Sequence, residues 1–300
     1  MNGVTQLATY RNGGYQVSVL SDGTKIRETL DASLPPVLPE QMDLKITDWC
    51  DAGCAWCHEK STTKGTHADI DATLELLKAL PKGAEIAIGG GDPLSHPEFE
   101  RFVSAVAEQG LIPSVTVNGL HFERHRAMLE KLTSEGKLYG VGFSYADSLP
   151  DWNYEHLVVH LIAGVHHPKV LDEAARRYKV LLLGYKQHGR GKKLFQIRRQ
   201  EVEDTLASWY RELFVVAKRH HLSFDNLAIE QLKPQRLFAN PQTFTEQYMG
   251  EEGKFSMYVD AVTQTFGLSS YSDERHAWTN MKDMFALVRS GQGYPIATVQ

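Results

Sequence analysis

From residue 41 onward, short apolar runs alternate with amphipathic stretches, and this alternation restricts the possible fold more than any other feature of the sequence. The apolar runs predict strands at residues 42–47, 85–88, 114–117, 140–145, 157–163 and 179–185. The amphipathic stretches predict helices at residues 69–80, 96–109, 125–134 and 169–177. Such βα-type units in succession require a parallel sheet with right-handed crossovers, either partly closed into a barrel or flat. We therefore expect an α/β core over residues 41–200.

The segments that flank this core predict an N-terminal hairpin and a C-terminal α/β extension. Within residues 1–40, period-two runs at 15–20 and 24–27 surround Asp22 and Gly23, a strong hairpin signal. A proline-rich stretch at 35–39 then predicts an extended linker. Residues 201–300 predict a long helix at 202–220, strands at 227–232, 255–260 and 263–267, and a final helix at 278–289.

All three cysteines of the 300-residue chain lie in one short stretch, as Cys50, Cys54 and Cys57. An odd number of clustered thiols makes a poor disulfide framework but a good metal site. A [4Fe–4S] cluster is normally held by four thiolates, so three leave one iron free to bind a small molecule. A zinc site completed by His58 is one alternative, and it would make the chain a zinc-stabilised binding module. Three unrelated buried cysteines are the other alternative.

The C-x3-C-x2-C spacing, with Trp56 before the last cysteine, resembles the radical S-adenosylmethionine (SAM) superfamily. This resemblance implies a partial (βα)6 TIM-like barrel in which Cys50, Cys54 and Cys57 hold a [4Fe–4S] cluster. It also implies that the open iron binds SAM. Reductive cleavage of SAM then gives methionine and a 5′-deoxyadenosyl radical, which takes a hydrogen atom from a substrate. The position of the cysteines after the first core strand agrees, because barrel chemistry gathers at the C-terminal ends of strands.

The ends of the other strands carry residues that the resemblance assigns to SAM. After the second strand, Gly89, Gly90, Gly91 and Asp92 stand where the family has Gly-Gly-Glu-Pro, and backbone carbonyls there are expected to bind the methionine amino group. One glycine is extra, and Asp replaces the usual Glu. The remaining candidate SAM contacts are Trp56, Asn118, Ser144, Ile162, Gly184 and Tyr185.

A basic, glycine-containing loop after the sixth strand is the candidate substrate contact. Lys186, His188, Arg190 and Lys192 could bind a phosphate or a carboxylate there, although most charge runs are solvated surface. We therefore expect a small anionic or nucleotide-like metabolite as substrate. A peptide or protein is the second choice, because the C-terminal extension resembles that of peptide-modifying family members. Nucleic acid is third, since the net charge of −5 gives no basic field.

Composition limits location and partners. No apolar run approaches a membrane span, and the N-terminus does not resemble a signal peptide. Clustered, unpaired cysteines fit a reducing cytoplasm. No cysteine remains for an auxiliary cluster, so electrons are expected from a flavodoxin or ferredoxin.

Overall fold

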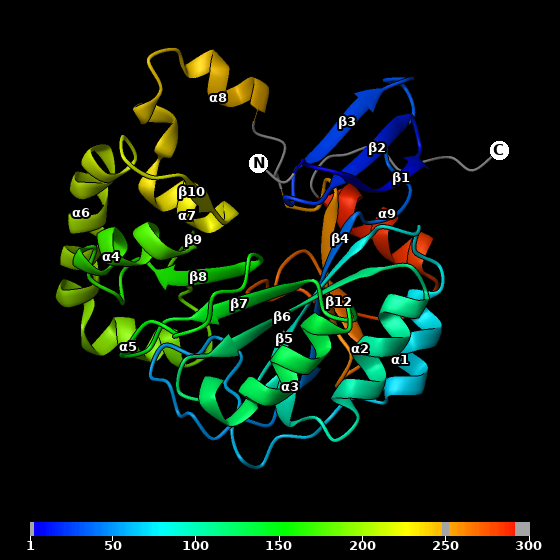
Figure 1. Cartoon of the computed structure of the whole chain (residues 1–300), viewed down its shortest axis with the longest axis horizontal. Coiled ribbons are helices and arrows are strands. Elements are labelled where there is room, and N and C mark those ends of the chain that lie inside the picture. Colours follow the sequence, from blue (N-terminus) through cyan, green and yellow to red (C-terminus); the bar gives the residue numbers. More distant parts are fainter. Residues whose placement is uncertain (1–2, 248–251, 292–300) are drawn as a thin grey trace.

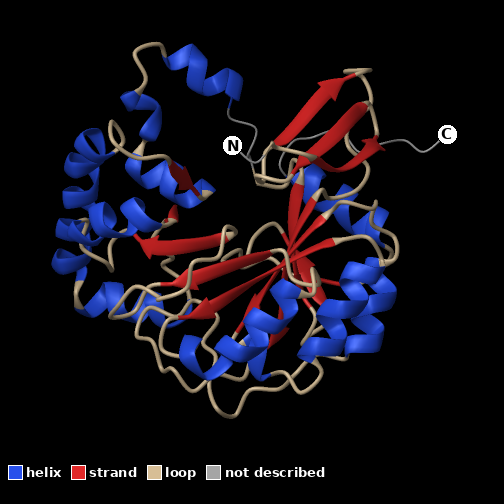
Figure 2. Cartoon of the chain, in the orientation of Figure 1, coloured by secondary structure: helices blue, strands red, loops and turns tan. Residues whose placement is uncertain are grey.

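The computed structural model describes residues 3–247 and 252–291, and a ten-stranded sheet dominates it (Figures 1 and 2). The strand order is β10-β9-β8-β7-β6-β5-β4-β11-β12-β13. Every neighbouring pair from β10 to β11 is parallel, whereas β12 and β13 are added antiparallel. The architecture is a mixed α/β fold with a curved, mainly parallel sheet, consistent with a partial TIM-like barrel.

The six core strands expected from the sequence are all confirmed. They are β4 (Gln41–Thr47), β5 (Glu85–Gly90), β6 (Ile112–Asn118), β7 (Gly140–Ser144), β8 (Leu157–Ile162) and β9 (Lys179–Leu183). The expected helices correspond to α1 (Ile70–Leu77), α2 (Phe99–Glu108), α3 (Phe122–Ser134) and α4 (Lys169–Arg177). A short 3-10 helix, η1 (Pro93–Ser95), precedes α2.

Alternation along β4 defines the two faces of the sheet. Met42, Leu44 and Ile46 are buried in the same core cluster as apolar residues of the covering helices. The intervening Asp43 and Lys45 point the other way, because successive side chains of a strand face opposite sides. The concave face of the sheet is therefore lined in part by charged residues.

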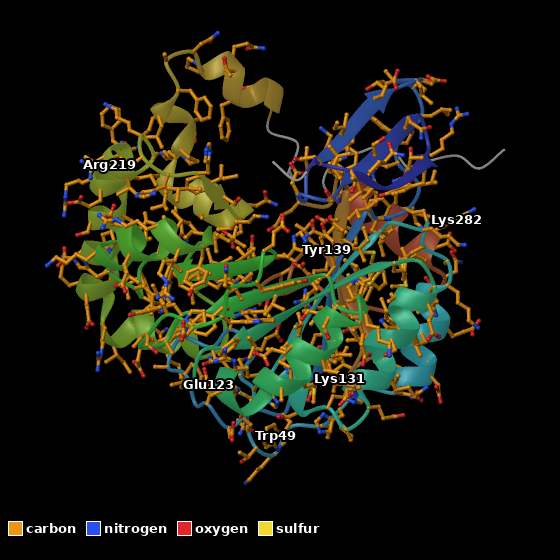
Figure 3. The ribbon with its side chains drawn as sticks, in the orientation of Figure 1. Trp49, Glu123, Lys131, Tyr139, Arg219 and Lys282 are labelled. Atoms are coloured by element: carbon orange, nitrogen blue, oxygen red, sulfur yellow. The ribbon has the colours of Figure 1, made fainter. Side chains whose placement is uncertain are left out.

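The parallel register brings the C-terminal ends of the strands to one edge. Lys45 pairs with Gly89, and Asn118 pairs with Ser144. Figure 3 labels Trp49 at this edge and Tyr139, which precedes β7, towards the other end. The cysteine loop, which follows β4, therefore begins at the edge where the predicted SAM contacts also lie.

The N-terminal hairpin is confirmed as β2 (Tyr15–Leu20) and β3 (Lys25–Thr29), and a further strand, β1 (Gln6–Asn12), completes a three-stranded antiparallel sheet. Gly23 has φ +90° in the turn, a conformation that favours glycine. Two ion pairs hold this sheet to the core: Lys25 to Glu85 at 2.6 Å, and Arg27 to Glu40 at 2.8 Å.

The C-terminal segments add strands to both edges of the core sheet, with β10 beside β9 and β11 beside β4. The elements are α5 (Gly189–Ile197), α6 (Arg199–Val216), β10 (Leu222–Phe224), α7 (Asn226–Leu232), η2 (Pro234–Leu237), α8 (Pro241–Gln247), β11 (Ser256–Asp260), β12 (Thr265–Gly267), β13 (His276–Ala277) and α9 (Met281–Gly291). The prediction of a strand at 227–232 was wrong, because Asp225 caps a helix there by accepting from Ala228 N–H at 2.7 Å. Within the described part of the chain, no helix is both long and apolar enough to cross a membrane.

Candidate active site

The three cysteines lie in the long loop between β4 and α1, and all are free and partly exposed. The Cys50 N–H donates to Thr62 O at 3.0 Å, and the Cys57 N–H donates to Cys54 O at 3.2 Å. Burial raises the pKa of Cys50 and Cys54, and the charges of the neighbouring thiols raise both further. Three thiols this close therefore need a positive partner to become thiolates together, which a metal centre provides.

The arrangement of the thiols does not suit one zinc ion. Four ligands at about 2.3 Å from zinc lie only about 3.8 Å from one another. Among the described residues, the group of three metal-ligating side chains within 4.8 Å of one another is Asp51, Asp92 and His121, and it contains no cysteine. His58 Nε2 lies 3.4 Å from Glu59 Oε1. The donor set therefore fits a larger iron–sulfur cluster better than a mononuclear zinc site.

The glycine turn after β5 is attached to the start of the cysteine loop. Gly91 N–H donates to Thr47 O, and Asp92 N–H donates to Trp49 O, both at 2.7 Å. A Cβ on Gly91 would lie 2.1 Å from Trp49 O, so only glycine allows this approach. A Cβ on Gly89 would meet nothing within 4 Å, so space for a ligand remains beside that residue.

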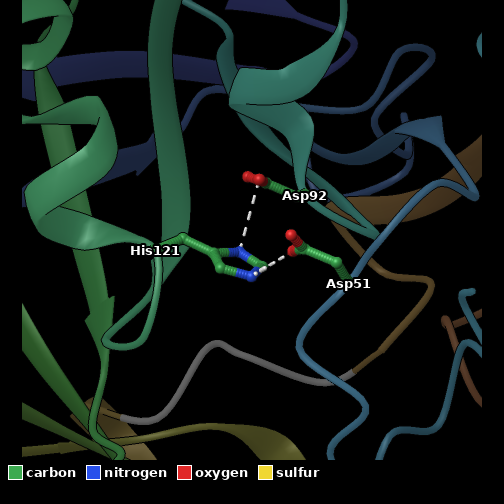
Figure 4. Close-up of side chains that lie close together, drawn as sticks. All are labelled: Asp51, Asp92 and His121. Atoms are coloured by element: carbon green, nitrogen blue, oxygen red, sulfur yellow. Dashed lines mark ion pairs between the residues drawn. The ribbon is translucent and has the colours of Figure 1, made fainter. Parts of the chain in front are cut away.

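The Asp92 side chain is turned towards α3 (Figure 4). Its Oδ2 lies 3.3 Å from His121 Nδ1, 3.0 Å from His125 Nε2 and 2.7 Å from Arg124 Nη2, and accepts from Ser95 Oγ at 2.6 Å. Burial acts to raise the pKa of Asp92, but these hydrogen bonds outweigh it and hold the pKa well below its usual range. The Oδ2 atom is thus held by α3 and Ser95, and Oδ1 is buried without a hydrogen-bond partner among the described residues, which leaves the backbone of Asp92 as the candidate SAM contact.

Arg124 joins this cluster to the cysteine loop. Its guanidinium lies 2.8 Å from one carboxylate oxygen of Asp51 and 2.7 Å from Asp92. His121 Nε2 also lies 2.8 Å from Asp51. Two of the three candidate metal ligands, Asp51 and Asp92, thus already share a cation, the Arg124 guanidinium. We therefore assign a structural role to this group of charged side chains: it holds Asp51, the residue after Cys50, against α3.

Arg190 holds the other side of the cysteine loop. Its guanidinium donates to Cys54 O at 2.9 Å and to Ser61 O at 2.8 Å, and its backbone N–H donates to Cys57 O at 2.8 Å. Gly189 has φ +57°, and a Cβ on it would lie 2.3 Å from His58 O. The glycines around Arg190 therefore permit α5 to dock on the loop, a structural role that the prediction of an anion site did not include.

The other three basic candidates do not converge with Arg190. Lys186 Nζ donates to Ser270 Oγ at 2.9 Å and lines a cavity in the open side of the barrel. His188 Nδ1 lies 3.5 Å from Asp273, and Lys192 is exposed. The structure does not bring these four residues together as one anion-binding site.

Two of the candidate SAM contacts stand together at the strand ends. Asn118 pairs with Ser144 in the register of β6 and β7, and its side-chain amide donates to Cys54 Sγ at 3.3 Å. Ile162 ends β8, and its N–H donates to His166 Nδ1 at 2.8 Å. The Trp56 ring contacts the same His166 edge-on, with ring centroids 6.0 Å apart. Asn118, Trp56 and Ile162 are thus joined to the cysteine loop or to one another.

Gly184 and Tyr185 have a different environment from the one expected. The Gly184 N–H donates to Asp225, and Tyr185 exchanges two backbone hydrogen bonds with the amide of Gln231 on α7. A Cβ on Gly184 would lie 2.5 Å from Leu227. Both residues therefore hold α7 against the end of β9, and their N–H groups are not free for an adenine ring.

Sequence reasoning missed most of the charged residues inside the barrel. Lys45 Nζ lies 2.6 Å from Asp48, 3.1 Å from Glu59 and 3.0 Å from Asp260, so it ties β4, the cysteine loop and β11 together. Tyr258 donates to Glu59 at 3.1 Å. The alternation of apolar and polar residues along β4 was the available signal, because polar residues on one face of a buried strand indicate a polar barrel interior.

His160 also faces this interior, opposite Gly142. A Cβ on Gly142 would lie 2.4 Å from the His160 ring, so glycine provides the space that the imidazole occupies. Burial lowers the pKa of His160 to about 4, which keeps the ring neutral at physiological pH. These contacts describe a histidine that is packed inside the fold.

Part of the sequence matches a family model, and the fold is similar to that of solved structures. The Radical SAM superfamily model matches residues 44–181, which run from β4 to β9 and include the cysteine loop. The core of the chain is thus similar to the radical SAM superfamily over a little less than half of its length. No curated protein matches its sequence significantly.

Solved structures with a similar fold include Streptococcus suis SuiB bound to the precursor peptide SuiA. That match has a TM-score of 0.55 at 13% identity and covers 84% of this chain, which spans only 65% of SuiB. The structure of SuiB bound to S-adenosylmethionine matches with a TM-score of 0.49 at 14% identity, and the match covers 77% of this chain and 60% of SuiB. The structure of BtrN in complex with AdoMet and 2-DOIA matches with a TM-score of 0.41 at 12% identity, and the match covers 83% of this chain and 80% of BtrN. At such identities the similarity to SuiB shows a shared fold and does not by itself show a shared function.

Proposed function

We propose that this enzyme holds a [4Fe–4S] cluster on Cys50, Cys54 and Cys57 and binds SAM beside it. The observation that carries the proposal is the position of three free thiols in the loop after β4, hydrogen-bonded at its start to the glycine turn of β5. When bound, the cluster supplies the electron that cleaves SAM to methionine and a 5′-deoxyadenosyl radical, which takes a hydrogen atom from the substrate. The surrounding loop and barrel orient the reactants and exclude water.

The residues at the strand ends provide the SAM site in this proposal. Backbone carbonyls of Gly89–Gly91 accept from the methionine amino group, where Gly89 leaves open space. Ser144 and Asn118 bind the polar part of the nucleoside, and Ile162 and Trp56 pack against its ring. Gly184 and Tyr185 contribute indirectly, by fixing α7.

The substrate in this proposal is a small metabolite or one residue of a peptide that reaches the barrel interior. The open side of the barrel contains a cavity of about 310 Å³, which is at the small end of ligand sites. The SuiB–SuiA complex makes a peptide reasonable, although the similarity extends to the fold alone. Nucleic acid has the least support, because the net charge is −5.

The electron source and the location follow from the cysteine count. Since the sequence has no thiol beyond the three of the cysteine loop, a separate flavodoxin or ferredoxin delivers the electron. Free, clustered thiols of this kind persist in a reducing compartment, so we place the enzyme in the cytoplasm.

Anaerobic purification and reconstitution test the proposal. We expect a brown protein with ~4 iron atoms per chain that forms 5′-deoxyadenosine from SAM under dithionite. Replacing any one of the three cysteines with alanine should remove both properties, whereas Ser33→Ala, on an exposed loop, should change neither. A colourless protein with one zinc and no 5′-deoxyadenosine contradicts the proposal.

A further inference from the structure

The cavity in the open side of the barrel has a distinctive charge pattern. It lies between the β9–β10–α7 side and the β4–β11–β12 side of the sheet, which face each other across the open edge (Figure 1). Its ionisable lining residues are Lys25, Arg27, Asp43, Lys186, Asp225, Glu252 and Tyr271. Three carboxyl groups and three cationic groups therefore face the same space.

Two of the three cations are already neutralised. Lys25 forms its ion pair with Glu85, and Arg27 forms one with Glu40 while its guanidinium lies 4.1 Å from the Phe255 ring centroid. Neither Glu85 nor Glu40 lines the cavity. Lys186 is left as the cation facing three carboxyl groups, and its ammonium donates to Ser270 Oγ.

The three carboxyl groups have polar contacts but no counter-ion. Asp225 accepts from the N–H groups of Gly184 and Ala228, and Glu252 accepts from Tyr271 Oη at 2.6 Å. Asp43 lies on β4 and is accessible from the cavity. Among the described residues, no ion pair within 4.0 Å joins any of the three to a cation. Desolvation by the surrounding protein raises the pKa of all three, although the Asp43 side chain is itself exposed to the cavity, and the charge of Lys186 offsets this only in part.

Lys186 links the cavity to the cysteine loop, although the described residues that line the cavity include none from that loop. A Cβ on Gly191 would lie 2.4 Å from Lys186 O and 3.2 Å from Trp56 O, so the backbone at Lys186 and the loop residue before Cys57 flank the same glycine. The backbone of Lys186 therefore packs near the cysteine loop, while its side chain lines the cavity that contains the carboxyl groups.

We propose that this cavity binds a cationic group of the substrate, a protonated amine or a guanidinium, between the carboxylates of Asp43, Asp225 and Glu252. The inference rests on the radical SAM function proposed above and names the substrate class for that site. A cation supplies the counter-charge that three partly desolvated carboxylates lack, and charge-assisted hydrogen bonds then fix its position. A volume of about 310 Å³ suits an amino-acid-sized molecule or one basic side chain of a peptide. This proposal replaces the anionic substrate expected from the basic loop, because Arg190 is committed to the cysteine loop.

The test compares three probes that share a five-carbon chain: 1,5-diaminopentane, 1,5-pentanediol and glutarate. Binding to the reconstituted enzyme with SAM is measured by saturation-transfer NMR and calorimetry at millimolar probe concentrations. We expect the diamine to bind in a salt-sensitive manner, and neither the diol nor glutarate to bind measurably.

Charge-removing variants of similar shape locate the site. Asp43→Asn, Asp225→Asn and Glu252→Gln should each weaken diamine binding by about tenfold or more, the usual worth of a hydrogen bond to a charged group. Asparagine at 225 retains helix-capping ability, so the fold is preserved. Lys186→Gln should strengthen diamine binding, and Glu28→Gln, an exposed carboxylate on β3, should leave it unchanged.

The outcomes separate this inference from the proposed function. Glutarate binding without diamine binding, no binding of any probe, or wild-type affinity in all three carboxyl variants would overturn the cationic site. Iron content and 5′-deoxyadenosine formation are measured on the same samples without any probe. If those two fail while the diamine binds, the radical SAM function is wrong and the cationic site stands.

Discussion

Arg190 Nε donates a hydrogen bond to the carbonyl oxygen of Cys54 at 2.9 Å, from a helix that begins more than a hundred residues later in the chain. The same guanidinium reaches Ser61 O at 2.8 Å, so one side chain spans the two ends of the segment that contains Cys54 and Cys57. The shape of the cysteine loop therefore depends on α5 as well as on β4.

Replacing Arg190 with lysine should loosen this loop while retaining the charge. A lysine has one donor nitrogen in place of the two that Arg190 uses, so it should leave at least one carbonyl poorly paired, and an unpaired buried acceptor costs about 1–3 kcal/mol. We expect lower iron content after reconstitution and a lower free energy of unfolding of the apoprotein in urea. Lys192→Met, on an exposed position of the same helix, is the control and should change stability by less than about 0.5 kcal/mol. Equal iron content in the two variants would contradict the role of Arg190 in holding the cysteine loop.

Asn118 should influence the reduction potential of the bound cluster. Its amide donates to Cys54 Sγ, while its Oδ1 accepts from Leu120 N–H at 2.9 Å and fixes the turn. Asn118→Asp keeps the turn acceptor but removes the donor to sulfur, so the potential should become more negative in anaerobic redox titration. Leu120→Ala, at an exposed position in the same turn, should leave the potential unchanged. An unshifted potential in Asn118→Asp would show that this hydrogen bond does not act on the cluster.

Asp92 should matter for stability. Its side chain is 1% exposed and contacts two histidines and Arg124, and removing one partner of a buried charged group costs about 3–5 kcal/mol. Asp92→Asn should lower the free energy of unfolding by that order, measured by urea denaturation of the apoprotein. Asp51→Asn removes a half-exposed partner of Arg124 and should cost only about 0–1 kcal/mol. Similar losses in the two variants would contradict a buried role for Asp92.

Acid should destabilise the protein partly through two histidines. Burial lowers the pKa of His160 and of His166 to about 4, against about 6.5 in an unfolded chain. As the pH falls from about 6.5 to 4, the unfolded state binds protons that the folded state does not bind, so the free energy of unfolding decreases in that window. Above about pH 6.5 the stabilisation is fully present. Each histidine should lower the free energy of unfolding by about 1–2 kcal/mol when the pH is reduced from 7 to 5.

The variant His166→Asn isolates one of these contributions. Asparagine can still accept from Ile162 N–H, as His166 Nδ1 does, but it does not titrate. Urea unfolding at pH 7 and pH 5 should therefore show a smaller pH effect in this variant than in the wild type. His167→Asn, at the exposed neighbouring position, should retain the wild-type pH effect. A full pH effect in His166→Asn would mean that His166 is not buried in its neutral form.

The core strands could be predicted because each is an apolar run between turn or helix signals, as at Glu85–Gly90. The strand predicted at 227–232 failed because the apolar residues Leu227 and Ile229 fit either period in so short a segment. The capping residue Asp225 was the overlooked signal. The β1 strand is mostly exposed, so it carries little apolar pattern.

The spacing of the cysteines indicated them as candidate cluster ligands, but it gave no indication of the residues that hold their loop. Arg190 meets Cys54 only through the tertiary fold, and its basic neighbours suggested an anion site instead. His121, Arg124 and His125 lie at i, i+3 and i+4 at the start of α3, a spacing that places them on one face. That pattern could have indicated a partner for Asp92, although one sequence does not reveal which strand end the helix faces.

The spectrum of the reduced cluster tests the central claim most directly. Electron paramagnetic resonance of the dithionite-reduced, reconstituted enzyme should show a cluster signal that changes on addition of SAM, because three cysteine ligands leave one iron open to it. A cluster signal that SAM leaves unaltered, or a protein that binds zinc and gives no signal, would contradict the assignment of Cys50, Cys54 and Cys57 to a SAM-binding cluster.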